Sequence, residues 1–170
     1  MKQPILTVAV LLASFLLIPN AFAATSEVTW SDYKSYRDID EGNEGRKQFR
    51  ERTFKDFEQH FTKLAATLPA EQTLKIVVTD VDLAGDTNAA SINRIRIIKQ
   101  LYSPRMNFSY QLLDANAKAI QADDVVVKDM NFMSGNNMKY RNEPLGYEKK
   151  MLDKWFNETF KTLIIKTNDK

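Results

Sequence analysis

The chain has 170 residues, no cysteine, one histidine and a nearly even balance of 24 basic and 22 acidic side chains. This length favours a single domain, and a composition of 44% hydrophobic and 27% charged residues is typical of a globular protein. A chain without cysteine has no disulfide, no thiolate metal site and no cysteine nucleophile. A lone histidine excludes zinc sites built from several imidazoles.

The first 23 residues have the features of a signal peptide. Lys2 precedes an apolar run over residues 5–18, and Ala21 and Ala23 place small side chains where a signal peptidase cleaves. The run is shorter than the roughly 20 residues of a membrane-spanning helix. We therefore expect cleavage after Ala23 and a periplasmic location. No cysteine follows the run, so we expect no lipid anchor, and the mature chain contains no segment typical of a membrane span.

Residues 24–170 are expected to form one domain, and its elements can be taken in chain order. A short β-prone run at 28–30 and a polar turn at 40–45 precede a helix over 46–68, where apolar residues recur three or four apart until Pro69 ends the pattern. Strands are expected over 74–83, 94–102, 106–112 and 125–132, which are rich in β-branched residues or alternate in polarity. A wide apolar stripe predicts a last helix over 145–163.

This order predicts the fold class. Consecutive strands joined by short turns favour antiparallel pairing, and two amphipathic helices need an apolar sheet face to cover. We expect a two-layer α+β domain, with a mainly antiparallel sheet of about five strands packed by two helices. At the turn over 114–117, Asn116 is expected to take the left-handed conformation.

Three carboxylates near the end of the strand at 74–83 are candidates for chemistry. Asp80, Asp82 and Asp86 occupy positions one, three and seven of a calcium-loop template, but Ala84 fills position five and a strand replaces the expected preceding helix. Asp80 and Asp82 lie on one face of a strand, where a carboxylate pair can perform acid–base work. These three residues are the candidate ligand or ion site, and the sequence identifies no metal site and no cofactor.

A structural interpretation of the same residues is favoured. If the strands at 74–83 and 94–102 form a hairpin, Asp80 faces Arg96 and Asp82 faces Arg94. Opposite charges directly across an antiparallel pair stabilise it by roughly 0.2–1 kcal/mol. The acidic pair is then a charge ladder.

Two further groups of side chains are candidates for a surface. Trp30, Tyr33 and Tyr36 are less periodic than the aromatic residues of the last helix, so they are candidates to line a groove for a partner. A basic run free of acids over 87–113 is a candidate for weak contact with an anionic envelope surface. Its members are Arg94, Arg96, Lys99 and Arg105, interleaved with Tyr102, Phe108 and Tyr110. We expect no nucleic-acid binding, because an exported chain with almost no net charge lacks the electrostatic footprint.

His60 has no recognisable catalytic partner in the sequence. It lies next to Phe61 and off the main apolar stripe of its helix, so we expect it at a solvated or edge position.

Several motifs together resemble one family. These are the TDVDLAG block at 79–85, the segments around 28–30, 36–39 and 110–114, the DMNF string at 129–132 and the EKxMLDxWF string at 148–156. They are similar to the bacterial domain-of-unknown-function family 3016, and the likeness spans nearly all of the mature chain. The resemblance implies a small exported protein of Gram-negative bacteria, and it implies no activity, ligand or catalytic residue.

Two functions from different classes remain open on the sequence. The favoured one is a non-enzymatic periplasmic binding or envelope accessory module that uses a sheet face or edge for an unknown envelope partner. The alternative is a carboxylate- or metal-dependent hydrolase that uses Asp80, Asp82 and Asp86.

Overall fold

The computed structural model describes residues 23–87, 94–135 and 138–164. The expected signal peptide, apart from Ala23, lies outside these residues. The elements in order are β1 (Thr25–Trp30), the 3-10 turn η1 (Tyr33–Ser35), α1 (Arg46–Ala65), β2 (Thr73–Asp82), β3 (Asp86–Thr87), β4 (Arg96–Ile97), β5 (Arg105–Leu113), β6 (Ala119–Lys128) and α2 (Gly146–Thr159).

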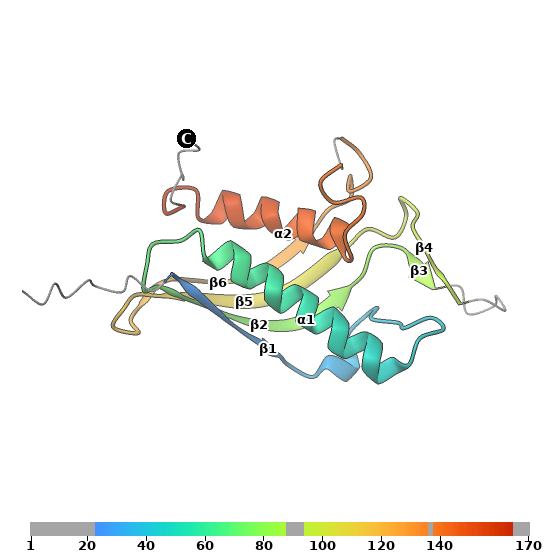
Figure 1. Ribbon diagram of the computed structural model, residues 1–170, viewed down its shortest axis with the longest axis horizontal. Coiled ribbons are helices and arrows are strands. Elements are labelled where there is room, and N and C mark those ends of the chain that lie inside the picture. The colour runs from blue at the N-terminus through green and yellow to red at the C-terminus, as the bar shows by residue number, and fades with distance from the viewer. Residues whose placement is uncertain (1–22, 88–93, 136–137, 165–170) are drawn as a thin grey trace, which may run out of the picture.

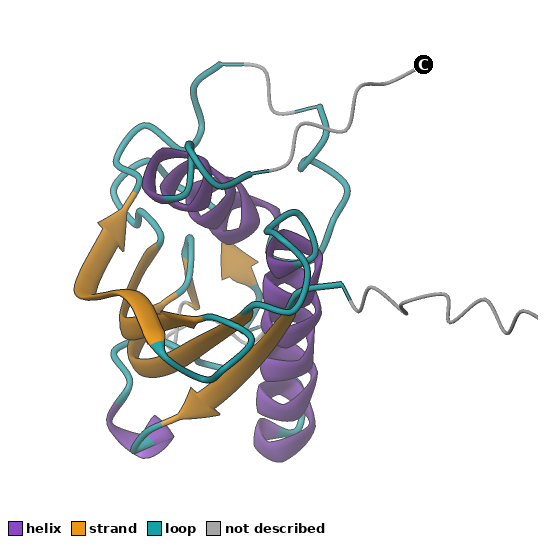
Figure 2. Ribbon diagram, turned by 90° about the vertical axis from the view of Figure 1, so that its left-hand side faces the viewer, coloured by secondary structure: helices purple, strands orange, loops and turns teal. Residues whose placement is uncertain are grey.

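Two layers build the molecule, with α1 and α2 side by side on one face of a four-stranded sheet (Figures 1 and 2). The sheet order is β1-β2-β5-β6, and β3 and β4 form a separate two-stranded ribbon. This confirms the expected α+β class, with four strands in the main sheet where about five were expected. No helix of the described ranges is both long and apolar enough to cross a bilayer.

The strand pairing corrects one expectation. β2 pairs in parallel with β1 and antiparallel with β5, so that Val77 lies opposite Thr29 on one side and Ser109 on the other. The hairpin expected between 74–83 and 94–102 is therefore wrong. Of the second segment only Arg96–Ile97 is a strand, and it pairs with Asp86–Thr87. β1 runs parallel to β2 because the intervening helix returns the chain to the same end of the sheet.

Other boundaries differ by a few residues. α1 ends at Ala65, because the chain tightens over 66–68 before Pro69. The last strand, β6, begins at Ala119 and ends at Lys128, earlier than the expected 125–132. In the turn between β5 and β6 the left-handed residue is Ala117, with φ of 59°, and not Asn116 as expected. The Asp114 carboxylate accepts the N–H groups of Asn116 and Lys118 and holds this turn.

The core lies between the helices and the covered sheet face. Aromatic rings fill its centre: Trp155 of α2 meets Phe108 of β5 edge-to-face at 4.8 Å, and Phe61 of α1 reaches the same Phe108 at 6.2 Å. Alternating residues of β2 and β5 complete the apolar layer, and these are Leu74, Ile76, Val78, Val81, Met106, Tyr110 and Leu112. Burial of this layer fixes the register, since a one-residue slip would expose all of it.

Candidate functional site

A polar cleft of about 720 Å³ opens at the end of the sheet where β2 terminates. The walls come from η1 and the loop after it, the first turns of α1, the end of β2 and β3. The lining residues are Tyr33, Lys34, Tyr36, Arg37, Asp38, Ile39, Asp40, Glu41, Arg46, Arg50, Asp82, Gly85, Asp86, Thr87 and Tyr102.

Backbone hydrogen bonds place the loop after η1 alongside the end of β2. The Asp38 N–H donates to the Val81 carbonyl at 3.0 Å, and the Leu83 N–H donates to the Asp38 carbonyl at 3.1 Å. The hydroxyl of buried Tyr36 donates to the Val78 carbonyl at 2.9 Å. Asp38 and Asp82 therefore occupy neighbouring positions on adjacent chain segments.

Arg96 of β4 holds the loop after η1 against the end of β2 through hydrogen bonds. Its guanidinium donates to both carboxylate oxygens of Asp38 at 2.7 and 3.0 Å, and to the Gly85 and Asp40 carbonyls at 3.1 Å each. The Arg96 and Asp38 side chains are only 19% and 18% exposed. Such bidentate charge-assisted pairs are among the stronger hydrogen bonds in proteins. Arg96 thus joins the loop after η1 to the end of the TDVDLAG block.

A second arginine holds the neighbouring carboxylate. Arg94 donates to both oxygens of Asp40 at 2.8 and 2.6 Å, and the Gly42 N–H donates to the same carboxylate at 2.9 Å. Burial opposes ionisation of Asp40, but the Gly42 N–H, the Thr87 hydroxyl and both arginines outweigh it and lower its pKa. Asp40 is therefore a charged structural residue of the cleft wall.

Asp82 has the opposite electrostatic environment. Its partial burial and the nearby Asp38 carboxylate raise its pKa, and Arg37 and Arg105 only partly offset them. Neither Asp82 nor Asp86 makes a side-chain hydrogen bond or ion pair to another described residue. These two carboxyl groups are therefore available to a ligand, and Asp82 can exchange a proton nearer to neutral pH than an ordinary aspartate.

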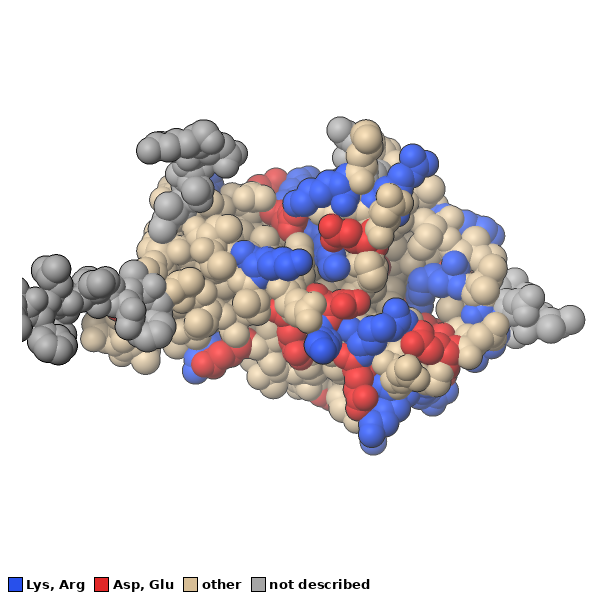
Figure 3. Space-filling view, in the orientation of Figure 1, with Lys and Arg blue, Asp and Glu red and all other residues tan. Residues whose placement is uncertain are grey.

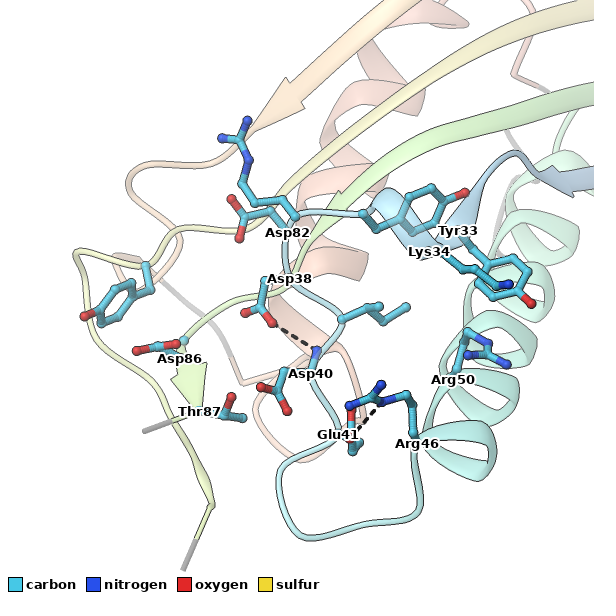
Figure 4. Close-up of a pocket in the computed structure, with 15 residues that line it drawn as sticks. Tyr33, Lys34, Asp38, Asp40, Glu41, Arg46, Arg50, Asp82, Asp86 and Thr87 are labelled. Atoms are coloured by element: carbon cyan, nitrogen blue, oxygen red, sulfur yellow. Dashed lines mark hydrogen bonds and ion pairs between the residues drawn. The ribbon is translucent and has the colours of Figure 1, made fainter. Parts of the chain in front are cut away.

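Most charges of the cleft are separated between two walls, with Arg37 as the exception, because it lies near Asp82 on the acidic side. Figure 4 shows Asp38, Asp40, Asp82 and Asp86 gathered on the side of β2 and β3, with Tyr33, Lys34, Arg46 and Arg50 on the side of η1 and α1. In Figure 3, charged side chains gather over the same end of the molecule, near the start of α1. Glu41 neutralises Arg46 at 3.1 Å. Arg50 instead stacks on Tyr33, 4.4 Å from the ring centroid, and makes no ion pair within the described residues.

The three candidate carboxylates are not brought together. Asp82 and Asp86 line the cleft, whereas Asp80 does not and accepts the Arg37 N–H at 2.8 Å. The expected charge ladder is also corrected, because Arg96 pairs with Asp38 and Arg94 with Asp40. Across the sheet, Asp80 lies opposite Asn107, and Asp82 opposite Arg105. No group of three or more histidine, aspartate or glutamate side chains in the described ranges is placed to hold a metal ion.

The aromatic trio divides between core and cleft. Trp30 stacks on Phe54 with centroids 4.0 Å apart, and its indole N–H donates to Glu58 at 2.8 Å, so it anchors α1 to β1. Tyr33 and Tyr36 line the cleft, although Tyr36 is only 8% exposed. The expectation of one groove formed by all three is therefore wrong.

The basic run also does not form one continuous surface. Arg94 and Arg96 are engaged with Asp40 and Asp38, while Phe108 and Tyr110 are buried at 2% and 3% exposure. Of its aromatic members only Tyr102 is open to solvent and lines the cleft.

Two buried polar interactions were missed by sequence reasoning. His60, expected at a solvated or edge position, is 11% exposed, and its Nε2 lies 2.7 Å from Asp153 Oδ1 of α2. Glu148 at the start of α2 is fully buried and accepts the Ala84 N–H at 2.7 Å; burial raises its pKa. A charged residue within the apolar stripe of the last helix was the available signal for Glu148.

The fold and the cleft define a small two-layer α+β protein with an open, charge-separated cleft at one end of its sheet. The chain belongs to the family described as Protein of unknown function (DUF3016), whose profile matches residues 24–158. The resemblance found from the sequence motifs is thus confirmed. No curated protein and no solved structure matches the chain.

Proposed function

We propose that this protein is an exported, periplasmic binding module whose cleft takes a zwitterionic ligand, such as a short peptide with free termini. The observation that carries the proposal is the separation of charges that form no ion pair within the described residues: Asp82 and Asp86 lie on one wall, and Arg50 and Lys34 lie on the other. Arg37 near Asp82 only partly offsets the acidic wall. A ligand with a cationic and an anionic group satisfies both walls at once. Tyr33 and Tyr102 also line the cleft and supply aromatic surface for the ligand.

Export is supported by where the family match and the first described strand begin. The family match starts at Ala24, and β1 starts at Thr25, with Ala24 itself 4% exposed. Cleavage after Ala23 would therefore leave the whole family match, with β1 and the elements after it, in the product. Fractionation of cells that express the full chain, with N-terminal sequencing, tests this: Ala24 is the expected first residue of a periplasmic product.

Binding is tested with di- to tetrapeptides in three forms: free, N-acetylated and C-amidated. We expect the free forms to raise the melting temperature at millimolar concentration, because a ligand that binds only the folded state stabilises it by RT ln(1 + [L]/Kd). Each capped form loses one charge and should bind more weakly. Equal shifts for all three forms would refute the zwitterion proposal.

Matched variants locate the effect. Asp86→Asn and Arg50→Gln each remove an unengaged charge from the cleft and should each weaken peptide binding about tenfold, the loss of roughly 1.4 kcal/mol. Asp124→Asn on β6 and Lys55→Gln on α1 make the same changes of charge at exposed positions outside the cleft and should leave binding unchanged.

One observation favours a second function, hydrolysis of the bound ligand. Asp82 has a raised pKa beside Asp38, whose carboxylate Arg96 fixes, and this is an arrangement suited to general acid catalysis. Asp80 lies outside the cleft, so this version of the carboxylate hydrolase relies on Asp82 and Asp86. Mass spectrometry of incubated peptides tests it: cleavage should be lost in Asp82→Asn even at peptide concentrations that saturate its weakened binding.

A further inference from the structure

β6 is an outer strand of the sheet, and two hydrogen bonds reveal the direction of its backbone groups. The N–H of Asp129, which follows the strand, donates to the Pro104 carbonyl beside β5 at 3.2 Å. The Asp124 N–H instead donates to the side chain of Asp123 at 2.8 Å. Because N–H groups alternate in direction along a strand, odd-numbered residues face β5. Even-numbered residues, Asp124, Val126 and Lys128 among them, turn their N–H and C=O groups away from the sheet.

These outward-facing residues are complementary to themselves. Residues 124–128 read Asp-Val-Val-Val-Lys. When two copies run antiparallel about a two-fold axis at Val126, Asp124 of each lies opposite Lys128 of the other, and Val126 lies opposite itself. All three side chains are exposed, Val126 by 64%, and neither charge has an ion pair within the described residues. We propose that two copies of this chain pair through β6 and form a continuous eight-stranded sheet.

The register agrees with the backbone as well as with the charges. A two-fold axis at Val126 places even-numbered residues opposite even-numbered residues, and these carry the unpaired backbone groups. An axis at any other residue of the strand would also do so, but only the axis at Val126 places Asp124 opposite Lys128. An axis at Asp124 would place two aspartates opposite each other, which is unfavourable. The charges thus select the pairing centred on Val126 over the one centred on Asp124.

The helix-covered side of the strand offers space for the second copy. A groove of about 190 Å³ lies between β6 and α2, lined among others by Val127, Met151 and Trp155. In the proposed register Val125 of the second copy lies opposite Val127, beside this groove. The Val125 side chain of the second copy therefore lies next to Val127 at a groove whose lining also includes Lys154 and Glu158.

Asp123 opposes the pairing in the single chain. Its carboxylate accepts a hydrogen bond from the outward N–H of Asp124. The second strand must bind this same N–H group. Charged side chains that blunt an exposed edge are a common protection against uncontrolled strand pairing. Asp123→Ala should therefore strengthen the dimer.

Sedimentation equilibrium of protein purified from cells that express the full chain tests the proposal. We expect a concentration-dependent dimer. Asp124→Lys and Lys128→Asp each place like charges opposite at two positions and should each weaken it at least tenfold, whereas the double variant restores complementarity. A mixture of the two single variants should form a heterodimer. Val126→Pro removes an outward N–H and should abolish pairing without disturbing the ladder to β5.

Lys55→Asp on α1 is the control for the change of net charge, and circular dichroism confirms that each variant is folded. A monomer at every concentration overturns the proposal. So does a dimer that is equally stable in both single variants, because another surface must then form it. Restoration in the double variant and heterodimer formation in the mixture are outcomes that only antiparallel pairing of 124 with 128 produces.

Discussion

His60 Nε2 lies 2.7 Å from Asp153 Oδ1, across the interface between α1 and α2. The other carboxylate oxygen of Asp153 accepts the Tyr140 hydroxyl and, at 3.1 Å, the Lys139 ammonium. One carboxylate therefore joins two helices and the loop before α2. Burial of Asp153 opposes its ionisation, but His60, Tyr140 and Lys139 outweigh burial and lower its pKa from 3.8 to about 2.

Asp153 should make stability depend on acid pH. Its pKa is lowered in the folded state, so the contribution is present above the unfolded value of 3.8 and is lost as pH falls toward 2. Asp153→Asn should lower the free energy of unfolding at pH 7 by about 2 kcal/mol, the equivalent of this shift. Urea unfolding at pH 7 and pH 2.5 measures it, and the deficit should shrink at the lower pH. Glu71→Gln, at an exposed position away from α2 and β6, should change neither value; a deficit independent of pH would contradict the assignment.

Gly85 should tolerate no side chain, because two constraints coincide there. Its φ is +83°, and a Cβ would lie 2.6 Å from the Ile97 carbonyl oxygen. Gly85→Ala should lower stability by about 2 kcal/mol or more, since the left-handed conformation alone costs roughly 1–2 kcal/mol. Gly135 has φ of +82°, but no atom of the described residues lies within 4 Å of its Cβ position. Gly135→Ala should therefore show the conformational cost alone, and equal losses in chemical denaturation would disprove the close approach at Gly85.

Arg96→Lys should damage the cleft more than Arg94→Lys. A lysine cannot make the bidentate pair with Asp38 and reach two carbonyls at once, and the 19% exposed Arg96 site gives water little chance to replace them. We expect a loss of about 2 kcal/mol in urea unfolding. The Arg94 side chain is 36% exposed, so its replacement should cost below about 1 kcal/mol. A larger loss of stability in Arg94→Lys than in Arg96→Lys would show that the Arg96 contacts do not hold the loop after η1.

The sequence alone predicted the helices and strands that bury one apolar face. α1, α2, β2 and β5 carry strong periodicity because each packs an apolar face against the core. β6 is exposed on much of both faces, so its pattern is weak, and its start was placed six residues late. His60 and Asp153 are 93 positions apart in the chain, and no local pattern connects them.

The arginine pairing shows what local reasoning cannot decide. Arg94 and Arg96 do pair with two aspartates spaced by two residues, as expected. The sequence offers two such pairs, however: Asp38 with Asp40, and Asp80 with Asp82. The choice between them depends on the parallel alignment of the loop after η1 with β2. These two segments are separated in the sequence by the whole of α1, so no local pattern predicts their contact. Consequently the cleft was only partly predictable, through Asp82, Asp86, Tyr33 and Tyr36.

Asp82 should have the opposite effect on stability from Asp153. Burial and the Asp38 carboxylate raise its pKa in the folded state, so the folded protein binds its proton more tightly than the unfolded chain does. Stability from this group therefore falls as pH rises from 3.8 through the folded pKa, and at pH 7 the charged Asp82 is a net cost. Asp82→Asn should raise the melting temperature at pH 7 and lose this advantage near pH 3, while peptide binding in the cleft weakens. Carbon-detected NMR titration of the Asp82 carboxyl checks the cause directly. A midpoint at or below 3.8 would remove the basis for both the stability gain and the proposed acid catalysis.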